Sequence, residues 1–292
     1  MKRRDFLLTA GGAAASGLVS FPSRASTPET QETEFVGVLT DLSRCNGCRK
    51  CEEACADANG LPLPDINDKS VFEETRTTDT NRFTVVNRWE TSKGTVYAKR
   101  QCMHCSQPAC ASACLVQAMK KLHSGPVIWR EDRCMGCRYC MVSCPFDVPK
   151  FEYNSAVPRI RKCILCYERL EKGELPACVQ GCPVEALRFG PRRELLEIAR
   201  HRIYENPGRY VSEIYGEHEA GGTEWLYISP VPFEEVGFPT NVGTRPYPEA
   251  TQDFLYSVPF VLCLWPAFLL GVSRSRSRSE EAGDGGEGEG EA

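Results

Sequence analysis

The 292-residue sequence is poor in histidine and has no excess of basic residues. It contains four histidines, which leaves few side chains for general acid–base catalysis near neutral pH. Lys and Arg number 35 against 39 Asp and Glu, so no basic surplus argues for nucleic acid as a partner. No Ser/His/Asp arrangement, phosphate-cradling glycine loop or flavin-binding fingerprint occurs. These absences disfavour hydrolases, nucleotide-binding enzymes and nucleic-acid-binding proteins.

Cysteine, in contrast, is abundant. Seventeen cysteines occur in a chain long enough to bury an apolar core, so they do not compensate for a small fold. Sixteen of them form four quartets, an internal repeat that organises the chain. The quartets are Cys45, Cys48, Cys51 and Cys55; Cys102, Cys105, Cys110 and Cys114; Cys134, Cys137, Cys140 and Cys144; and Cys163, Cys166, Cys178 and Cys182. Only Cys263 stands apart, in an apolar segment, where we expect a small buried hydrophobe.

The spacing within the quartets favours iron–sulfur clusters over disulfides. Cysteines separated by two residues seldom pair with each other, so sixteen of them would need an elaborate cross-linked net. In "CMGCRYCMVSCP" (134–145), three closely spaced thiols can ligate one cluster. The fourth follows a wider gap, precedes Pro145 and turns away to ligate the other cluster of a pair. All four quartets keep this final three-residue gap. Zinc in the Cys₄ sites of a structural scaffold is the alternative.

Both ends of the chain carry targeting or membrane patterns. Residues 1–25 have a basic start with Arg3 and Arg4, a mildly apolar run and a small-residue cleavage site, which resembles a twin-arginine export signal. Residues 254–272 carry no charge and are long enough to span a bilayer, although two prolines lie inside them. Arginines follow in 273–292 and place this disordered tail in the cytoplasm by the positive-inside rule. The alternative is an apolar hairpin docked on a partner.

The body of the chain is expected to be α+β. Short alternating segments predict hairpins over 82–100, 120–130 and 150–162, each around a turn. A helix is predicted to open at Pro191, with Leu195, Ile198, Ala199 and Ile203 on one face. From about residue 206 to 248 the chain is rich in glycine and proline, which predicts an extended wrap with little regular structure. We expect the interior to consist mainly of bound groups rather than of side chains.

Charged residues flank several candidate ligands. Cationic neighbours favour the reduced, more negative state of a cluster and raise its potential. The alternative is that they are solvated surface charges. His104 lies within the second quartet, and we expect it to donate a hydrogen bond or to pack beside a cluster. The flanking cations are Arg49, Lys50, Arg138, Arg161 and Lys162.

Two stretches carry a specific family resemblance. "KCILCYERLEKGELPACVQGCPVEAL" (162–187) and "CMHCSQPAC" (102–110) resemble the four-cluster ferredoxin-type electron-transfer subunits of bacterial respiratory oxidoreductases. The chain resembles in particular the exported, membrane-anchored subunits of the hydrogenase-2 type and of the high-molecular-weight cytochrome complex. The export signal, the region "GEHEAGGTEWLYIS" (216–229) and the C-terminal apolar segment are shared. The resemblance covers roughly residues 35–272.

The resemblance implies four [4Fe–4S] clusters whose ligands are exchanged between quartets. No quartet has the tryptophan substitution that gives a three-iron cluster in some relatives. Leu115 stands where the family usually has proline, and Ala56 follows the first quartet; these departures remove no ligand. The implied ligand sets are Cys45, Cys48, Cys51 and Cys182; Cys163, Cys166, Cys178 and Cys55; Cys102, Cys105, Cys110 and Cys144; and Cys134, Cys137, Cys140 and Cys114.

The implied fold is two interlocked bacterial-ferredoxin-like modules with short hairpins, an extended C-terminal wrap and one C-terminal transmembrane helix. The expected division is a four-cluster domain over 35–215, with 35–60 plus 160–215 and 98–160 as its two modules, a partner-contacting segment over 216–250, an anchor over 254–272 and a cytoplasmic tail over 273–292.

The implied function is electron transfer by a non-catalytic subunit, with no catalytic residue. Its expected partners are a catalytic subunit of hydrogenase or molybdopterin type or a multihaem cytochrome, and an integral-membrane quinone-reactive subunit. The expected location is the periplasmic face of the inner membrane. A zinc scaffold and a self-contained reductase of a small molecule are the other candidates.

Overall fold

The computed structural model describes residues 34–283. The predicted export signal over 1–25 and the last nine residues of the predicted tail lie outside this range. Short strands occupy Val36–Asp41 (β1), Val85–Thr91 (β2), Gly94–Arg100 (β3), Met119–Lys121 (β4), Val127–Trp129 (β5), Lys150–Phe151 (β6), Ile160–Arg161 (β7), Leu187–Pro191 (β8) and Trp225–Ile228 (β9).

The helices alternate with these strands, and most are a turn or two long. The α-helices are Lys50–Ala58 (α2), Ala109–Ser112 (α3), Tyr139–Val142 (α4), Tyr167–Glu171 (α5), Ala177–Gln180 (α6), Arg192–Glu205 (α7) and Gln252–Gly283 (α8). Single 3₁₀ turns lie at Ser70–Phe72 (η1), Glu131–Arg133 (η2), Glu219–Gly221 (η3), Phe233–Val236 (η4) and Tyr247–Thr251 (η5). The mixed α+β class expected from the sequence is confirmed.

The largest sheet has three strands in the order β8-β1-β9. The central strand β1 pairs antiparallel with β8, with Val36 opposite Pro191, and parallel with β9, with Val38 opposite Trp225. Successive side chains of a strand point to opposite faces, so both faces of β1 must be covered. Val38 belongs to one buried apolar cluster and Leu39 to another. This sheet is therefore a central layer and not a surface hairpin.

Residues 206–248 have little regular structure, as predicted, but the sequence prediction missed strand β9. Every residue of Trp225–Ile228 is buried, and the strand completes the main sheet. Its run of large apolar and aromatic side chains is typical of a strand covered on both faces. The flanking glycines and prolines mask this short signal, because they dominate the composition of the longer window.

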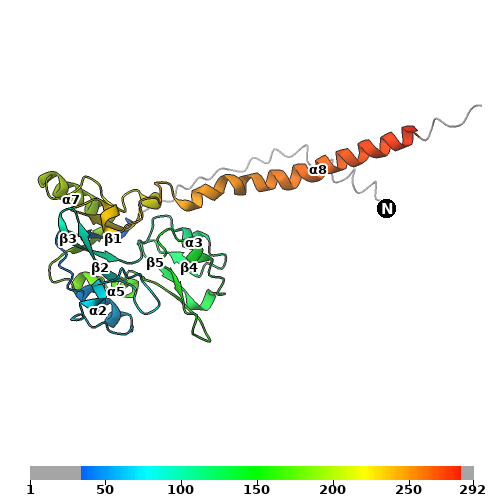
Figure 1. The fold of residues 1–292 in the computed structure, drawn as a ribbon. Coiled ribbons are helices and arrows are strands. Elements are labelled where there is room, and N and C mark those ends of the chain that lie inside the picture. The colour runs from blue at the N-terminus through cyan, green and yellow to red at the C-terminus, as the bar shows by residue number, and fades with distance from the viewer. Residues whose placement is uncertain (1–33, 284–292) are drawn as a thin grey trace, which may run out of the picture. The chain divides into compact units, whose positions relative to one another are not determined.

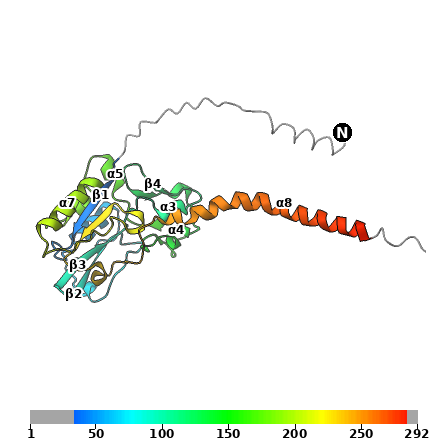
Figure 2. The same ribbon diagram turned by 90° about the horizontal axis from the view of Figure 1, so that it is seen from above.

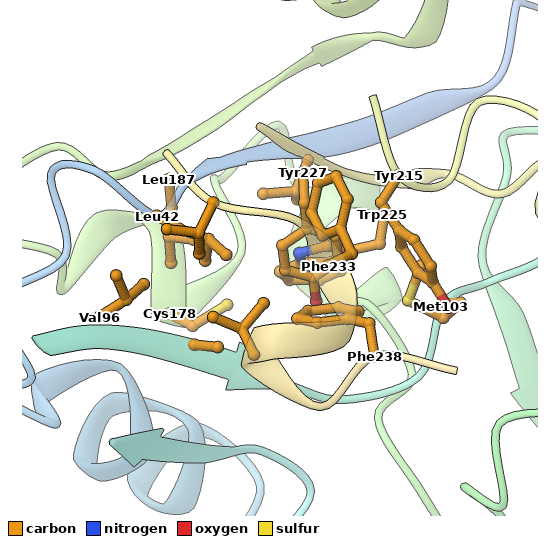
Figure 3. Packing of buried hydrophobic residues seen from close by; sticks show 14 of the residues in the cluster. Leu42, Val96, Met103, Cys178, Leu187, Tyr215, Trp225, Tyr227, Phe233 and Phe238 are labelled. Carbon is orange, nitrogen blue, oxygen red and sulfur yellow. The ribbon is translucent and has the colours of Figure 1, made fainter. Parts of the chain in front are cut away.

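The interior also contains a real side-chain core, contrary to expectation. Tyr215, Trp225, Tyr227, Phe233 and Phe238 gather beneath the main sheet, as Figure 3 shows. The Tyr215 and Tyr227 rings meet the Phe238 ring edge to face, with centroids 4.8 and 4.7 Å apart. Aromatic side chains bury more area than any others, so this group supplies much of the apolar burial. The sequence underestimates it because its members lie in the segment predicted to be irregular.

The opposite face of the main sheet is covered by α7. Leu195 and Ala199 of this helix are fully buried and pack with Leu39, Leu226 and Ile228 of the sheet. Ile198 and Ile203 lie at the edge of the same cluster. The predicted helix and its apolar face are confirmed, with Pro191 as the residue that precedes the first turn.

The three predicted hairpins are present. They pair β2 with β3, β4 with β5 and β6 with β7, all antiparallel. The turn between β4 and β5 contains Gly125, whose φ of 123° is unfavourable for any other residue. The last hairpin is reduced to two residues a strand, which fits the interruption of its pattern by Pro158.

Two groups of elements surround the cysteine quartets. We name the sheet region β1, β8 and β9 with α2, α6 and α7, and the hairpin region α3, β4, β5 and α4. Helix α2 packs on α6, and α3 packs on α4. Both views of the ribbon show α3 and β4 together, on the opposite side of the body from α7 and β1 (Figures 1 and 2). The first and fourth quartets thus belong to the sheet region, and the second and third to the hairpin region.

The predicted apolar segment 254–272 lies within α8. This helix has 32 residues and contains both Pro259 and Pro266. The stretch Tyr247–Arg276 is long and apolar enough to cross a membrane, and its most apolar part is unburied. Cys263 is exposed on this helix, so the expectation of a buried position is wrong for the chain by itself. Leu262 and Leu264 beside it are exposed as well.

Candidate metal centres

One set of four cysteines from two distant quartets surrounds a cavity in the sheet region. Cys45, Cys48 and Cys51 of the first quartet and Cys182 of the fourth line a space of about 370 Å³, including its opening to solvent. Burial raises the pKa of Cys45 to about 11, and the nearby thiols of Cys182 and Cys48 add to the increase. Antiparallel pairing of β1 with β8 and packing of α2 on α6 bring these two quartets together.

A second set has the same arrangement in the hairpin region. Cys134, Cys137 and Cys140 of the third quartet and Cys114 of the second line a cavity of about 320 Å³, including its opening. Burial raises the pKa of Cys140 to about 11, and Cys114, Cys134 and Cys137 contribute further. Cys137 is exposed, so this site lies at the surface of the chain.

Of the remaining eight cysteines, five are buried and three are half-buried. Burial raises the pKa of Cys55 well above its ordinary value, and the neighbouring Cys163 and Cys178 raise it further, followed by Cys166. Cys55 of the first quartet therefore lies near three cysteines of the fourth quartet.

The last set is centred on Cys105. Burial raises the pKa of its thiol well above the ordinary value, and Cys102, Cys144 and Cys110 add to the increase. Cys144 comes from the third quartet and the other three from the second. The packing of α3 on α4 accounts for this approach.

The loops within the quartets share a backbone conformation. The residue before the second cysteine has a positive φ in all four: Gly47 at 71°, His104 at 50°, Gly136 at 71° and Leu165 at 55°. Left-handed residues turn successive N–H groups toward one side, and such concavities bind anions, including iron–sulfur clusters. His104 and Leu165 adopt this conformation at a steric cost that glycine avoids.

The turns after the quartets are also alike. Main-chain N–H groups of Gln117, Asp147 and Glu185 donate to the carbonyl oxygens of Cys114, Cys144 and Cys182, and all three donors are left-handed. The turn after Cys114 forms although Leu115 replaces the proline found after the other two cysteines. Leu115 itself is 88 % exposed. Alanine at position 56 has a different effect, because α2 continues through it to Ala58.

Several sulfurs already accept hydrogen bonds. The main-chain N–H of Leu165 donates to Cys163 Sγ over 3.4 Å, and that of Met119 donates to Cys114 Sγ over 3.4 Å. Asn59 Nδ2 donates to Cys55 Sγ over 3.7 Å. Such donors stabilise thiolate ligands and tune the potential of a cluster.

The donor set suits a polynuclear cluster better than a single ion or disulfides. All cysteines of residues 34–283 are free thiols. Thiolates on zinc lie about 2.3 Å from the metal, so four sulfurs converge on one point. Within the described range, no three His, Cys, Asp or Glu side chains could hold one metal ion in this way. Sulfurs placed around a cavity fit a larger group, and soft thiolates are the ligands that iron–sulfur clusters take.

The cations predicted to flank the ligands differ in burial. Arg49 is buried and bonds the carboxylate of Glu52, with Nη2 to Oε2 at 3.1 Å. Lys162 is buried as well, whereas Lys50 and Arg138 are exposed. Sequence reasoning missed Lys99, a fully enclosed lysine that lines the cavity of Cys45, Cys48, Cys51 and Cys182. No spacing signal could have found it, because it lies in β3, outside all four quartets.

His104 is a buried packing residue, as predicted, but its bonding differs. Its Nδ1 accepts a hydrogen bond from the main-chain N–H of Val127 over 3.0 Å. Burial lowers the pKa of this imidazole well below its ordinary value, and Lys162 and Lys121 lower it further. The neutral ring therefore carries its hydrogen on Nε2, which has no partner within the described part of the chain.

Comparisons with known proteins agree with this chemistry. Residues 94–192 match the 4Fe-4S dicluster domain family. A protein of Nitratidesulfovibrio vulgaris is 47 % identical over 283 residues, which cover 93 % of this chain and 76 % of that protein. Hydrogenase-2 operon protein HybA of Escherichia coli O157:H7 is 36 % identical over 88 % of this chain and 90 % of its own length. This chain belongs to the ferredoxin-type iron–sulfur subunits of bacterial respiratory oxidoreductases.

A further relative of this iron–sulfur subunit is named as a subunit of an enzyme. The iron-sulfur subunit of nitrate-inducible formate dehydrogenase from Escherichia coli K12 is 33 % identical, over 69 % of this chain and 71 % of its own length. The family resemblance stated from the sequence is confirmed. The iron–sulfur subunit carries 4Fe–4S clusters and functions in electron transfer.

Proposed function

We propose that the iron–sulfur subunit conducts electrons through four [4Fe–4S] clusters between a catalytic or cytochrome subunit and a membrane partner. The ligand sets are those expected from the sequence: three cysteines of one quartet and the last cysteine of its partner quartet. The observation that carries the proposal is the cavity lined by Cys45, Cys48, Cys51 and Cys182, since 130 residues lie between Cys51 and Cys182 in the sequence. Each cluster, when bound, accepts and passes on one electron.

The order of the clusters follows from contacts between the sets. Cys55, Cys102 and Cys163 share one buried apolar cluster with Phe83, which supports direct neighbourhood of their two sets. Each set is named here by its first cysteine. The proposed path for electrons, called the wire below, leads from the set of Cys134 to that of Cys102, then to that of Cys163 and finally to that of Cys45.

The same contacts support two interlocked ferredoxin-like modules. Residues 35–60 with 160–215 form one module and residues 98–160 the other, and exchange of the last cysteine of each quartet joins the two halves of a module. The partner-contacting role falls to the parts of 216–250 outside the buried strand β9. We place the anchor at 254–272, with export by the twin-arginine route and the body at the periplasmic face.

The partners follow from the relatives. The formate dehydrogenase subunit and the hydrogenase-2 operon protein are named after enzymes that oxidise small molecules. A catalytic subunit of hydrogenase or molybdopterin type is therefore the proposed electron donor or acceptor on one side, with a multihaem cytochrome as the other candidate. An integral-membrane quinone-reactive subunit is proposed on the second side, next to the apolar helix.

The metal content tests the four clusters. Anaerobically purified protein is expected to contain about sixteen iron and about sixteen acid-labile sulfide per chain, because each cluster has four of each. Zinc without sulfide would replace the proposal with a structural scaffold. Turnover of a small molecule by the isolated chain would replace it with a self-contained reductase.

Substitution of Cys144 tests the exchange of ligands. Cys144→Ala is expected to abolish or convert the cluster of Cys102, Cys105 and Cys110, as seen by EPR, and to leave the cluster of Cys134 intact. Cys263→Ala is the control, since Cys263 lies outside the four sets, and it should retain all four signals. Damage confined to the cluster of Cys134 would refute the exchange.

A further inference from the structure

Two buried lysines stand among the ligand sets without a carboxylate partner. Lys99 and Lys162 are each 2 % exposed. Lys99 Nζ donates to Gln101 Oε1 over 2.8 Å and lies 4.3 Å from the centre of the Trp225 ring. Lys162 Nζ donates to the carbonyl oxygens of Cys163, over 2.9 Å, and Val127. Neither lysine takes part in any ion pair among residues 34–283.

Other cations of the same interior form ion pairs with a buried carboxylate. Lys121 Nζ lies 3.0 Å from Oε1 of the fully buried Glu224, and Arg49 bonds Glu52. A buried charge that lacks a counter-charge costs several kcal/mol, which is why such groups are almost always paired. Neutral oxygens and an aromatic face lessen this cost only in part. The compensating negative charge for Lys99 and Lys162 must therefore come from elsewhere.

The nearest source of negative charge is the thiolates of the ligand sets. Lys99 lines the cavity of Cys45, Cys48, Cys51 and Cys182. Lys99 also reaches the neighbouring set, because its Nζ lies over the Trp225 ring, and Trp225 shares one buried apolar cluster with Cys178 of that set. It stands at the junction of two sets.

Lys162 occupies the next junction along the proposed wire. Its Nζ lies 3.7 Å from Cys102 Sγ and donates to the carbonyl oxygen of Cys163, so it touches ligands of two different sets. It also precedes Cys163 directly in the sequence. The set of Cys163 is thus the only one that adjoins both lysines in the described structure, and the set of Cys134 adjoins neither.

We propose that Lys99 and Lys162 are the counter-charges of the wire at two successive junctions and raise the reduction potentials of the three clusters that they adjoin. This inference rests on the four-cluster function proposed above and extends it. An electron that enters a cluster adds a negative charge, and a fixed ammonium group in a poorly polarisable interior stabilises that charge. The cluster of Cys163 receives the effect of both lysines, and the cluster of Cys134 receives that of neither.

The test is a redox titration monitored by EPR on the complete complex with Lys162→Met. The signals are assigned beforehand from single ligand substitutions. At a fixed potential, the ratio of reduced to oxidised cluster should fall at least about tenfold for the clusters of Cys102 and Cys163, equivalent to about 59 mV for one electron. The cluster of Cys134 should change by less than about twofold, because the lysine does not adjoin it.

Two variants separate charge from packing. Lys162→Arg keeps the positive charge and should keep the potentials near those of the unchanged protein. Lys50→Met removes an exposed cation next to Cys51, where water and salt screen it, and should shift the ratio by less than about twofold. An equal loss of iron in Lys162→Met and Lys162→Arg would assign the lysine to packing and overturn the proposal for it.

The second lysine makes the proposal independently falsifiable. Lys99→Met should lower the reduction potentials of the clusters of Cys45 and Cys163. At a fixed potential, the ratio of reduced to oxidised cluster at Cys102 should change by less than about twofold. This pattern overlaps the Lys162 pattern at one cluster alone. Unchanged potentials with full iron and sulfide would overturn the counter-charge proposal and leave the four-cluster function standing. Lack of sulfide in the unsubstituted protein would instead overturn the four-cluster function.

Discussion

The sheet region and the hairpin region contain the same kind of cysteine sets, but the buried cores beside these sets differ in composition. In the sheet region, β1 is covered on one face by the aromatic cluster of Tyr215, Tyr227 and Phe233 and on the other by α7. In the hairpin region, the buried cluster consists of Met119, Val127 and Ile160 with Cys110 and Cys140. One region has a side-chain core beside its cysteines, and in the other the cysteines are themselves a large part of the core.

This difference separates two sources of stability. A side-chain core of aromatic and aliphatic groups persists when a metal is lost, because its apolar burial does not depend on the metal. A core whose members are ligands loses its organisation with the metal, since metal binding is then a large share of the folding free energy. The two regions should therefore respond unequally to the same treatment.

Removal of the clusters should have the largest effect. Chelation of iron under oxidising conditions should lower the hydrogen-exchange protection factors of the β4–β5 amides. The decrease should be roughly a hundredfold larger than that for the β1, β8 and β9 amides. Hydrogen exchange read by mass spectrometry measures the two regions in one sample. An equal loss of protection in both would show that the side-chain core of the sheet region cannot stand without its clusters.

Truncation within the aromatic core should have the next largest effect. Phe233→Ala is expected to lower the free energy of unfolding by about 3–5 kcal/mol, because a fully buried ring leaves a cavity. Denaturant titration followed by circular dichroism on loaded protein measures it. Tyr204→Ala is the control, since this tyrosine is 87 % exposed, and should stay within about 0.5 kcal/mol. A small effect of Phe233→Ala would mean that clusters dominate here too.

A smaller effect is expected where α6 meets α2. A Cβ on Gly181 would lie 2.9 Å from the Cβ of Ala54, so Gly181→Val should cost about 1–3 kcal/mol by forcing the two helices apart. The substitution should also weaken the cluster that we propose Cys182 shares with the first quartet, and iron should then be released at a lower denaturant concentration. At Gly208 the same added Cβ meets no atom within 4 Å, and Gly208→Val should be close to neutral.

The smallest predicted effect is a gain in the hairpin region. The turn after Cys114 has the same hydrogen bond as the turns that contain Pro145 and Pro183. Leu115→Pro should therefore stabilise the protein by about 0.4–1 kcal/mol, because proline restricts the unfolded chain. Thermal unfolding compared with Leu115→Ala measures this gain. A loss in place of a gain would show that the turn needs the freedom of leucine.

Repeated patterns made much of the fold predictable from the sequence. The alternation of "RFTVVNRWE" and "TVYAKR" is local, and it correctly predicted the β2–β3 hairpin. The helix after Pro191 was found because Leu195 and Ala199 recur at helical spacing. The exchange of ligands between quartets stays a prediction from the family resemblance; in the structure Cys114 lines a cavity with three cysteines of the third quartet.

The features that escaped prediction depend on contacts between distant segments. Strand β9 is four residues long and becomes a strand by pairing with β1, almost two hundred residues earlier. Lys99 has the sequence environment of an ordinary strand residue, and its burial arises from Trp225 and the cysteines around it. Such positions have no periodicity of their own, since tertiary structure alone determines them.

The place of β1 between β8 and β9 also constrains biogenesis. Residues Val36–Asp41 leave the ribosome long before their partners Leu187–Pro191 and Trp225–Ile228. Closing such distant pairings is slow, because the intervening chain loses much entropy before any contact forms. Iron delivery to the thiols between 102 and 144 can begin while translation continues. With the proposed ligand sets, the Cys45 site is complete only after Cys182 has emerged, and we expect maturation of the subunit to proceed from its middle outward.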